Sequence, residues 1–264
     1  MSALHIENLT AGYGKRRILE NVSLQADAGE IVAILGENGS GKTTLLRAVQ
    51  GIIPLQSGTV AVNGTDLASL NTRKRAALVT MMPQDHPAAA GLTGMDMIET
   101  AFYPSRGLFG TPTAADREKI RTSAESFGIA HLLERDLSEM SAGERQMISL
   151  LRAAVQDTPV LLLDEPSSAL DFNHTGALFV LLKRLAAHGK TILLVLHDPS
   201  LALRYASKIV RMGHGTTEDI LDNRMPDYEK IEASLRMLYP DLRVNRDPLF
   251  CYTETSSYKE ATLC

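Results

Sequence analysis

The sequence is poor in cysteine and has no excess of positive charge. Its 264 residues include two cysteines, Cys251 and Cys264, both near the end and without the spacing of a metal site. This excludes a disulfide framework and is typical of a reducing compartment. The net charge is −4, and the basic residues are scattered rather than gathered in a stripe. No nucleic-acid partner is therefore predicted.

Long hydrophobic runs are also missing. The first residues have neither the basic region nor the apolar stretch of a signal peptide. The longest apolar runs, around residues 160–163 and 191–196, are far shorter than the roughly 20 residues that a membrane helix needs. Internal repeats, heptads and low-complexity linkers are absent as well. With 44% hydrophobic residues, the chain is expected to be soluble and to fold as one large domain or two small ones.

Apolar runs of strand length alternate with helical patterns along the chain. Such runs are typical of strands covered on both faces, as in a parallel sheet, and occur at residues 29–35, 77–82, 160–164 and 191–196. Amphipathic helical patterns occupy residues 42–51, 113–128, 143–156 and 174–189. This order predicts an α/β fold with a mostly parallel central sheet.

The early strands have a different pattern. Residues 3–9 and 21–26 alternate between apolar and polar, and Asn63-Gly64 is a strong hairpin signal. A smaller antiparallel sheet is therefore predicted beside the central one, with another hairpin turning at His214-Gly215. Between about residues 85 and 156 no strong strand signal occurs, which indicates a nested helical subdomain.

Residues 36–44, GENGSGKTT, match the phosphate-binding pattern G-x-x-x-x-G-K-[ST]. Its glycines let backbone amides turn toward a phosphate, and the following helix adds its positive N-terminal end. A glycine-rich turn without a ligand is the alternative, but the match follows a buried strand and opens a helix. We expect Lys42 to reach the β- and γ-phosphates and Thr43 to ligate Mg²⁺. The predicted ATP-binding residues of this loop are Gly36, Glu37, Asn38, Gly39, Ser40, Gly41, Lys42, Thr43 and Thr44.

Two carboxylates follow the buried strand VLLLDEP, residues 160–166. A strand end delivers side chains to the same sheet edge as the phosphate loop. Asp164 is predicted to hold Mg²⁺ and Glu165 to polarise an attacking water. His197 ends another buried strand, and Tyr13 lies between two glycines. Taken alone, these two are an ordinary strand-end histidine and an ordinary turn aromatic.

The order of the motifs resembles the ATP-binding-cassette (ABC) ATPase family over nearly the whole chain. That order is Tyr13, GENGSGKTT, Gln84, MSAGERQ (140–146), VLLLDEP, SSALD (167–171) and His197. The resemblance implies that Tyr13 stacks on adenine, that Gln84 senses Mg²⁺ and the γ-phosphate, and that His197 holds the γ-phosphate and water. It further implies that Asp171 crosses to a second subunit, and that a signature loop contacts the ATP bound there. The signature-loop residues are Ser141, Ala142, Gly143 and Glu144.

The signature loop departs from the family pattern at three positions. The family usually has Leu at Met140, Gly at Ala142 and often Gln at Glu144. Ser141 and Glu144 also fit the capping box S-x-x-E, so the carboxylate is expected to turn back to the helix cap. A carboxylate turned the other way would repel phosphate.

The resemblance implies a P-loop NTPase of the ABC-ATPase fold. Residues 1–222 would form the ATPase domain, with a nested helical subdomain at 85–156, and residues 223–264 an extension whose end is expected to be disordered. The chain would bind ATP and Mg²⁺, pair with a second and identical ATPase subunit, and drive a membrane permease. It would be cytoplasmic, peripheral at the inner face of the membrane.

The cargo is indicated by a narrower similarity. Residues 103–120 and 196–210 resemble importers of iron-siderophore, haem and cobalamin, which work with a separate substrate-binding protein. Residues 86–110, which include Arg106 and Phe109, are apolar and rich in glycine and are predicted to contact the permease.

Other functions stay open at this point. One is a soluble cassette ATPase for cofactor assembly or repair, and another is an importer ATPase for an unrelated small molecule. A P-loop NTPase outside the family, acting as a monomeric switch, would hydrolyse nucleotide at a rate per chain independent of concentration. The chain has no Asn-Lys-x-Asp base-reading motif, so ATP is expected rather than GTP.

Overall fold

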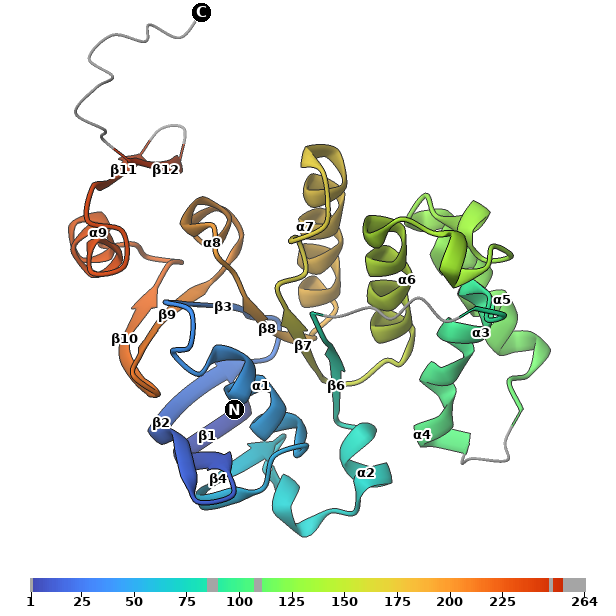
Figure 1. The fold of residues 1–264 in the computed structure, drawn as a ribbon, viewed down its shortest axis with the longest axis horizontal. Helices are drawn as coiled ribbons and strands as arrows, with labels where there is room; N and C mark the ends of the chain where they lie inside the picture. Colours follow the sequence, from blue (N-terminus) through green and yellow to red (C-terminus); the bar gives the residue numbers. More distant parts are fainter. Residues whose placement is uncertain (1, 85–89, 107–110, 247–248, 254–264) are drawn as a thin grey trace, which may run out of the picture.

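A six-stranded sheet lies at the centre of the computed structural model, which describes residues 2–84, 90–106, 111–246 and 249–253 (Figure 1). The strand order is β10-β9-β3-β8-β7-β6, and all neighbours are parallel except β10, which is antiparallel to β9 at one edge. The strands are β3 (Ile31–Gly36), β6 (Val79–Met82), β7 (Val160–Asp164), β8 (Thr191–Val195), β9 (Lys208–Gly213) and β10 (Thr216–Asp222). The predicted parallel core is thereby confirmed.

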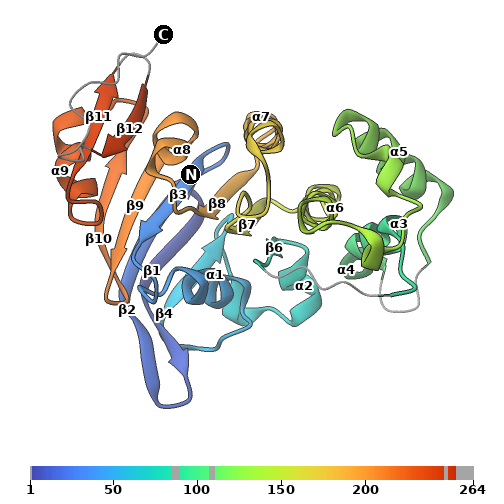
Figure 2. The same ribbon diagram turned by 45° about the horizontal axis from the view of Figure 1, so that its top comes forward.

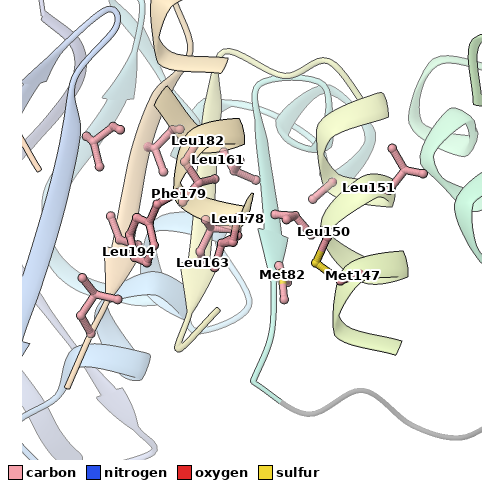
Figure 3. Close-up of a cluster of buried hydrophobic side chains, with 14 of the residues drawn as sticks. Met82, Met147, Leu150, Leu151, Leu161, Leu163, Leu178, Phe179, Leu182 and Leu194 are labelled. Atoms are coloured by element: carbon pink, nitrogen blue, oxygen red, sulfur yellow. The ribbon is translucent and has the colours of Figure 1, made fainter. Parts of the chain in front are cut away.

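Alternate residues of the central strands face two separate apolar cores. Val32 and Ile34 of β3 belong to the core shared with α1 (Lys42–Gln50) and the smaller sheet. Ala33 and Leu35 face the opposite core, which is covered by α6 (Ala142–Val155) and α7 (Phe172–Ala187). Figure 3 shows side chains of α6 meeting β6, and side chains of α7 meeting β7 and β8. Burial on both faces is the reason why these strands are continuously apolar.

The smaller sheet is antiparallel, as predicted, with the order β2-β1-β4-β5. Its strands are β1 (Ser2–Tyr13), β2 (Arg16–Asp27), β4 (Leu55–Val62) and β5 (Thr65–Asp66). Asn63 and Gly64 have φ angles of 48° and 77°, the left-handed conformation that a tight two-residue hairpin requires. His214 and Gly215 turn in the same way between β9 and β10. Figure 2 shows this sheet packed beside α1.

The segment between β6 and β7 is helical where it is described, in agreement with the prediction. Its helices are α3 (Gly94–Glu99), α4 (Tyr103–Arg106), α5 (Ala114–Ser126) and α6, with short 3₁₀ turns at Thr100–Phe102, Ala130–Leu132 and Leu137–Glu139. A capping box begins α5, in which Thr113 and Asp116 hydrogen-bond each other's backbone amides. In Figure 1 these helices lie on the side of the sheet opposite to the C-terminal strands. Residues 85–89 and 107–110 lie outside the described residues.

The chain after β10 contains structure that the sequence analysis did not predict. It consists of α9 (Tyr228–Arg236), β11 (Leu242–Arg246) and β12 (Leu249–Thr253). Ile231, Leu235 and Leu242 are at most 1% exposed and share the core that contains Leu203 and Ile209. The segment from 228 to 242 therefore packs on the ATPase core. Residues 254–264, for which disorder was expected, lie outside the described residues.

The remaining elements are α2 (Thr72–Ala76), α8 (Pro199–Tyr205) and a 3₁₀ turn at Leu67–Ser69. Within the described part of the chain, no helix is both long enough and apolar enough to cross a bilayer.

Candidate functional site

The loop from Gly36 to Gly41 connects β3 to α1 and curls over the side chain of Lys42. The Lys42 ammonium donates hydrogen bonds to the carbonyl oxygens of Gly36 (2.7 Å) and Glu37 (2.8 Å). Gly39 and Gly41 have φ angles of 82° and 100°, which other residues rarely adopt. A Cβ atom at Gly36 would collide with the backbone of β9. These glycines are therefore required by the shape of the loop.

The loop offers an anion both a charge and an unpaired donor. Among the described residues, the buried hydroxyl of Ser40 has no hydrogen-bond partner. Burial lowers the pKa of Lys42, while the neighbouring Glu165 and Asp164 carboxylates act in the opposite direction. A phosphate beside the lysine would favour its charged form. The loop is therefore chemically suited to phosphate.

Thr43 and Asp164 are side by side at the ends of α1 and β7. The Thr43 hydroxyl donates to the Asp164 carboxylate at 3.1 Å, and burial raises the pKa of Asp164. Within the described ranges, no group of three or more His, Cys, Asp or Glu side chains is placed to hold a metal ion. Two oxygen ligands nevertheless suit Mg²⁺, which usually keeps several waters and takes further ligands from phosphate. The residues present therefore fit a Mg²⁺–nucleotide complex.

Glu165 is held between two other predicted site residues. Its Oε2 accepts a hydrogen bond from the Gln84 amide at 2.7 Å, and its Oε1 lies 2.5 Å from the His197 Nε2. The backbone φ angle of Glu165 is 53°, which is uncommon for a residue other than Gly, Asn or Asp. The backbone conformation at the end of β7 therefore brings together three residues that lie 81 and 32 positions apart in the chain.

Tyr13 lies at the end of β1 and is 51% exposed. The Arg47 guanidinium of α1 donates to its hydroxyl at 3.3 Å. Tyr13 and Arg47 line a hollow of about 620 Å³ together with Ile52 and Pro83. Glu37 to Ser40 line a different hollow. The ring is thus accessible for stacking, and α1 connects it to the phosphate loop.

The signature loop forms the N-terminal cap of α6. Ser141 and Glu144 make a full capping box, in which the Ser141 amide donates to the Glu144 carboxylate at 2.7 Å. Arg135, which the sequence analysis did not identify, donates to the other carboxylate oxygen at 2.6 Å. The Ser141 amide, followed by the Arg135 charge, holds the pKa of Glu144 below its usual value. The expectation that this carboxylate turns back to the cap is confirmed, and Ala142 does not have a positive φ.

Gly143 touches the loop that follows Glu165. A Cβ atom at Gly143 would lie 2.9 Å from the Ala169 carbonyl oxygen, closer than real Cβ contacts come. Asp171, at the end of that loop, accepts a hydrogen bond from the His174 amide and caps α7. The signature loop and Asp171 line a hollow of about 710 Å³ that shares no residue with the hollow beside the phosphate loop.

Gln146 also belongs to the site, although the sequence analysis gave it no role. Its side-chain amide donates to the Glu165 carbonyl at 3.2 Å, and its oxygen accepts from the Ala169 amide at 3.2 Å. The residue is 2% exposed. Burying a side-chain amide costs free energy unless both its nitrogen and its oxygen are hydrogen-bonded. The occurrence of a glutamine among the apolar residues of this helix was the sequence signal that could have identified it.

Comparison with known proteins agrees with this arrangement. The sequence profile of the family described as "ABC transporter" matches residues 19–168. The iron(3+)-hydroxamate import ATP-binding protein of Bacillus subtilis is 34% identical over 268 residues, covering 98% of each chain. A cobalamin import ATP-binding protein of Halobacterium salinarum is 35% identical over 220 residues, which are 82% of this chain and 54% of that protein.

The fold also matches solved structures. A dimeric bacterial ABC transporter cassette superposes with a TM-score of 0.74 at 25% identity, covering 84% of this chain and 99% of that one. The family profile spans more than half of the described sequence and includes the phosphate loop, the signature loop and Glu165. Because the fold, the motifs and the relatives agree, this chain belongs to the ABC transporter family, as one of its ATP-binding and ATP-hydrolysing subunits.

Proposed function

We propose that this chain powers the import of an iron chelate or a related metal-containing compound, such as haem or a corrinoid, through a membrane permease. The proposal is supported by the relatives named for iron(3+)-hydroxamate and cobalamin import, one of which aligns over 98% of the chain. An importer for an unrelated small molecule is the alternative. The resemblance of residues 103–120 and 196–210 to the same importers favours the first reading.

We propose that the phosphate loop and Lys42 bind the nucleotide phosphates, while Tyr13 stacks on the adenine. Thr43, Asp164 and Gln84 would hold Mg²⁺, which when bound neutralises charge on the phosphates. Glu165 would orient the attacking water and accept its proton, and His197, beside that carboxylate, would hold the γ-phosphate and the water. These roles require mainly that the side chains are held in place around the nucleotide. The buried strands and the capped helices supply that rigidity.

We propose that the functional unit is a dimer of two such chains. The hollow lined by the signature loop and the hollow lined by Glu37 to Ser40 have no residue in common. One nucleotide would contact both loops only where two chains meet. Ser141, Ala142, Gly143 and Glu144 would then face the ATP of the other subunit, with Asp171 at the interface. ATP would favour the closed pair and hydrolysis would release it.

The permease would hold the dimer at the inner face of the membrane, and a separate binding protein would deliver the cargo. Residues 86–110 are proposed to contact the permease. Of these, Phe109 and His86 lie outside the described residues, and Arg106 is paired with Asp116 of α5 at 2.6 Å. Residues 1–222 are proposed as the catalytic domain and 223–264 as its extension.

The observation that carries the proposed ATPase mechanism is the contact of Glu165 with both Gln84 and His197. Glu165→Gln is expected to keep ATP binding, to lose nearly all hydrolysis and to accumulate an ATP-bound dimer in size-exclusion chromatography. Glu125→Gln, on the exposed face of α5, is the matched control and should behave as wild type. Steady-state hydrolysis near the wild-type rate in Glu165→Gln would remove Glu165 from this role.

The cargo is tested in a deletion strain of the source organism complemented with the wild-type gene or with Glu165→Gln. Wild type should restore uptake of a radiolabelled ferric siderophore, haem or cobalamin, and the variant should not. Restored uptake of an unrelated solute only would favour the alternative cargo.

A further inference from the structure

Tyr239 connects the C-terminal extension to the backbone of His197. Its hydroxyl donates a hydrogen bond to the His197 carbonyl oxygen at 2.7 Å, across 42 positions of sequence. The ring is half-buried and packs against the core beneath α8. Tyr239 lies well beyond residue 168, where the family profile ends. The extension thus reaches a residue whose side chain touches Glu165.

The backbone holds Tyr239 on both sides. Its amide donates to the Leu235 carbonyl at 2.9 Å, and its own carbonyl accepts from the Leu242 amide at 2.9 Å. Leu235 is fully buried and Leu242 is 1% exposed. A tyrosine anchored by a helix end and by a strand start has little freedom to move its hydroxyl.

A polar network fixes α9 relative to the central sheet. Arg211 of β9 donates to the Ser234 hydroxyl of α9 at 3.0 Å and to the Asp219 carboxylate of β10 at 2.7 Å. The Ser234 hydroxyl also donates to Asp219 at 2.6 Å. The platform that carries Tyr239 is therefore tied to the same sheet that carries His197.

His197 is the point where this platform meets the site. It follows β8 and precedes the Asp198 cap of α8, so its peptide lies between two fixed elements. The carbonyl bonds Tyr239, while the ring lies 2.5 Å from the Glu165 carboxylate. Rotating the His197 peptide would also move the ring.

We propose that Tyr239 is a positioning residue for ATP hydrolysis, whose hydroxyl holds the His197 backbone so that the imidazole stays aligned with Glu165. Residues 228–242 then form part of the hydrolytic apparatus. This inference rests on the proposed role of His197. Tyr239 lines neither the hollow beside the phosphate loop nor the hollow beside Tyr13, so its effect is expected on turnover and not on affinity.

Tyr239→Phe removes the hydroxyl and keeps the ring. In the full chain we expect kcat for ATP hydrolysis to fall on the order of tenfold, with KM unchanged, because a small misplacement of a catalytic group has effects of this size or larger. Tyr205→Phe is the matched control, since it removes a hydroxyl from α8 while its ring stays stacked on Phe179 at 4.4 Å. Unchanged kcat in Tyr239→Phe would overturn the inference, as would an equal loss in both variants.

A double-mutant cycle with His197→Ala separates this inference from the proposed function. If Tyr239 acts through His197, then adding Tyr239→Phe to His197→Ala should lower single-turnover hydrolysis no further. Full additivity would overturn the positioning role while leaving the role of His197 intact. Wild-type hydrolysis in His197→Ala alone would overturn both. Melting temperatures measured on the same preparations identify variants whose loss comes from unfolding.

Discussion

At the scale of single residues, the departure of the signature loop from the family pattern at Glu144 has a physical explanation. A glutamate beside a phosphate site would repel its ligand. In this chain, the Glu144 carboxylate is bonded to the Ser141 amide on one oxygen and to Arg135 on the other. Its charge is therefore neutralised within its own subunit, and the departure is compatible with an anion site at the start of α6.

Glu144→Gln tests this arrangement. We expect hydrolysis close to wild type, because Gln also completes a capping box. The variant should melt at a lower temperature at pH 7, since the ion pair with Arg135 is lost. The folded-state pKa of Glu144 is lowered, so its contribution is present above the unfolded value of about 4.3 and disappears as pH falls through the folded value.

The prediction is checked by measuring the melting temperatures of the wild type and of Glu144→Gln between about pH 3 and pH 7. The gap between them should be full at neutral pH and should close in acid. A gap of constant size would show that the carboxylate charge is not the source of the difference. Glu125→Gln is again the control for removing an exposed charge.

Tyr13 gives a second prediction at this scale. Tyr13→Ala should raise KM for ATP more than it lowers kcat, because base stacking is present in the ground state and the transition state alike. Loss of a base stack costs roughly 1–3 kcal/mol in single-strand complexes. Tyr13→Phe, which keeps the ring and loses only the contact with Arg47, should remain near wild type. A large fall in kcat at constant KM would contradict stacking.

At the scale of elements, α6 is in direct contact with the loop after β7. The Ala169 carbonyl fills the space where a Cβ of Gly143 would lie, and Gln146 bonds both the Glu165 carbonyl and the Ala169 amide. The helix that begins at the signature loop therefore also braces the loop that carries Glu165. Any ligand that shifts the start of α6 is expected to shift Glu165.

Gly143→Asp should separate ATP binding from hydrolysis. Its Cβ and its charge would be forced against the Ala169 carbonyl and into the hollow of the signature loop. ATP binding through Lys42 should remain, while dimer closure and hydrolysis should fail. Gly176→Ala in α7 is the matched control, because an added Cβ there meets nothing within 4 Å. Nucleotide binding and ATPase rate are measured on one preparation, and loss of both in a folded protein would contradict the cross-subunit role.

Elements also show what the sequence could predict. The buried strands could be predicted because strands covered on both faces consist of apolar residues. The two hairpins could be predicted because their positive φ angles favour Gly and Asn. The elements after Asp222 were missed, since α9 is short and its apolar residues, Ile231 and Leu235, acquire meaning only from the core they enter. Arg135, Gln146 and Tyr239 were also missed. Gln146 and Tyr239 bond backbone carbonyls 19 and 42 positions away, and Arg135 gains a role only because the fold places it beside Glu144.

At the scale of the whole molecule, the phosphate loop and the signature loop lie in different parts of one chain. The phosphate loop lies between β3 and α1, and the signature loop begins α6 in the helical part of the molecule (Figure 1). The hollows beside these loops have no lining residue in common. In the proposed dimer, a complete nucleotide site would be assembled from the phosphate loop of one chain and the signature loop of the other.

The ATPase rate per chain should therefore rise with protein concentration. In dilute solution we expect a low specific rate, which increases and then saturates as dimers form. A specific rate that is independent of concentration would instead support a monomeric P-loop NTPase.

The two contacts of Glu165 connect three neighbouring strand ends, because Gln84 follows β6, Glu165 follows β7 and His197 follows β8. Each oxygen of a carboxylate has two lone pairs, so Glu165 can still accept a hydrogen bond from water while Gln84 and His197 stay in place. Because of these contacts, a movement of either outer strand end would reach the carboxylate. The rate of hydrolysis is thus expected to respond to a partner that displaces Gln84, even if that partner never touches the nucleotide.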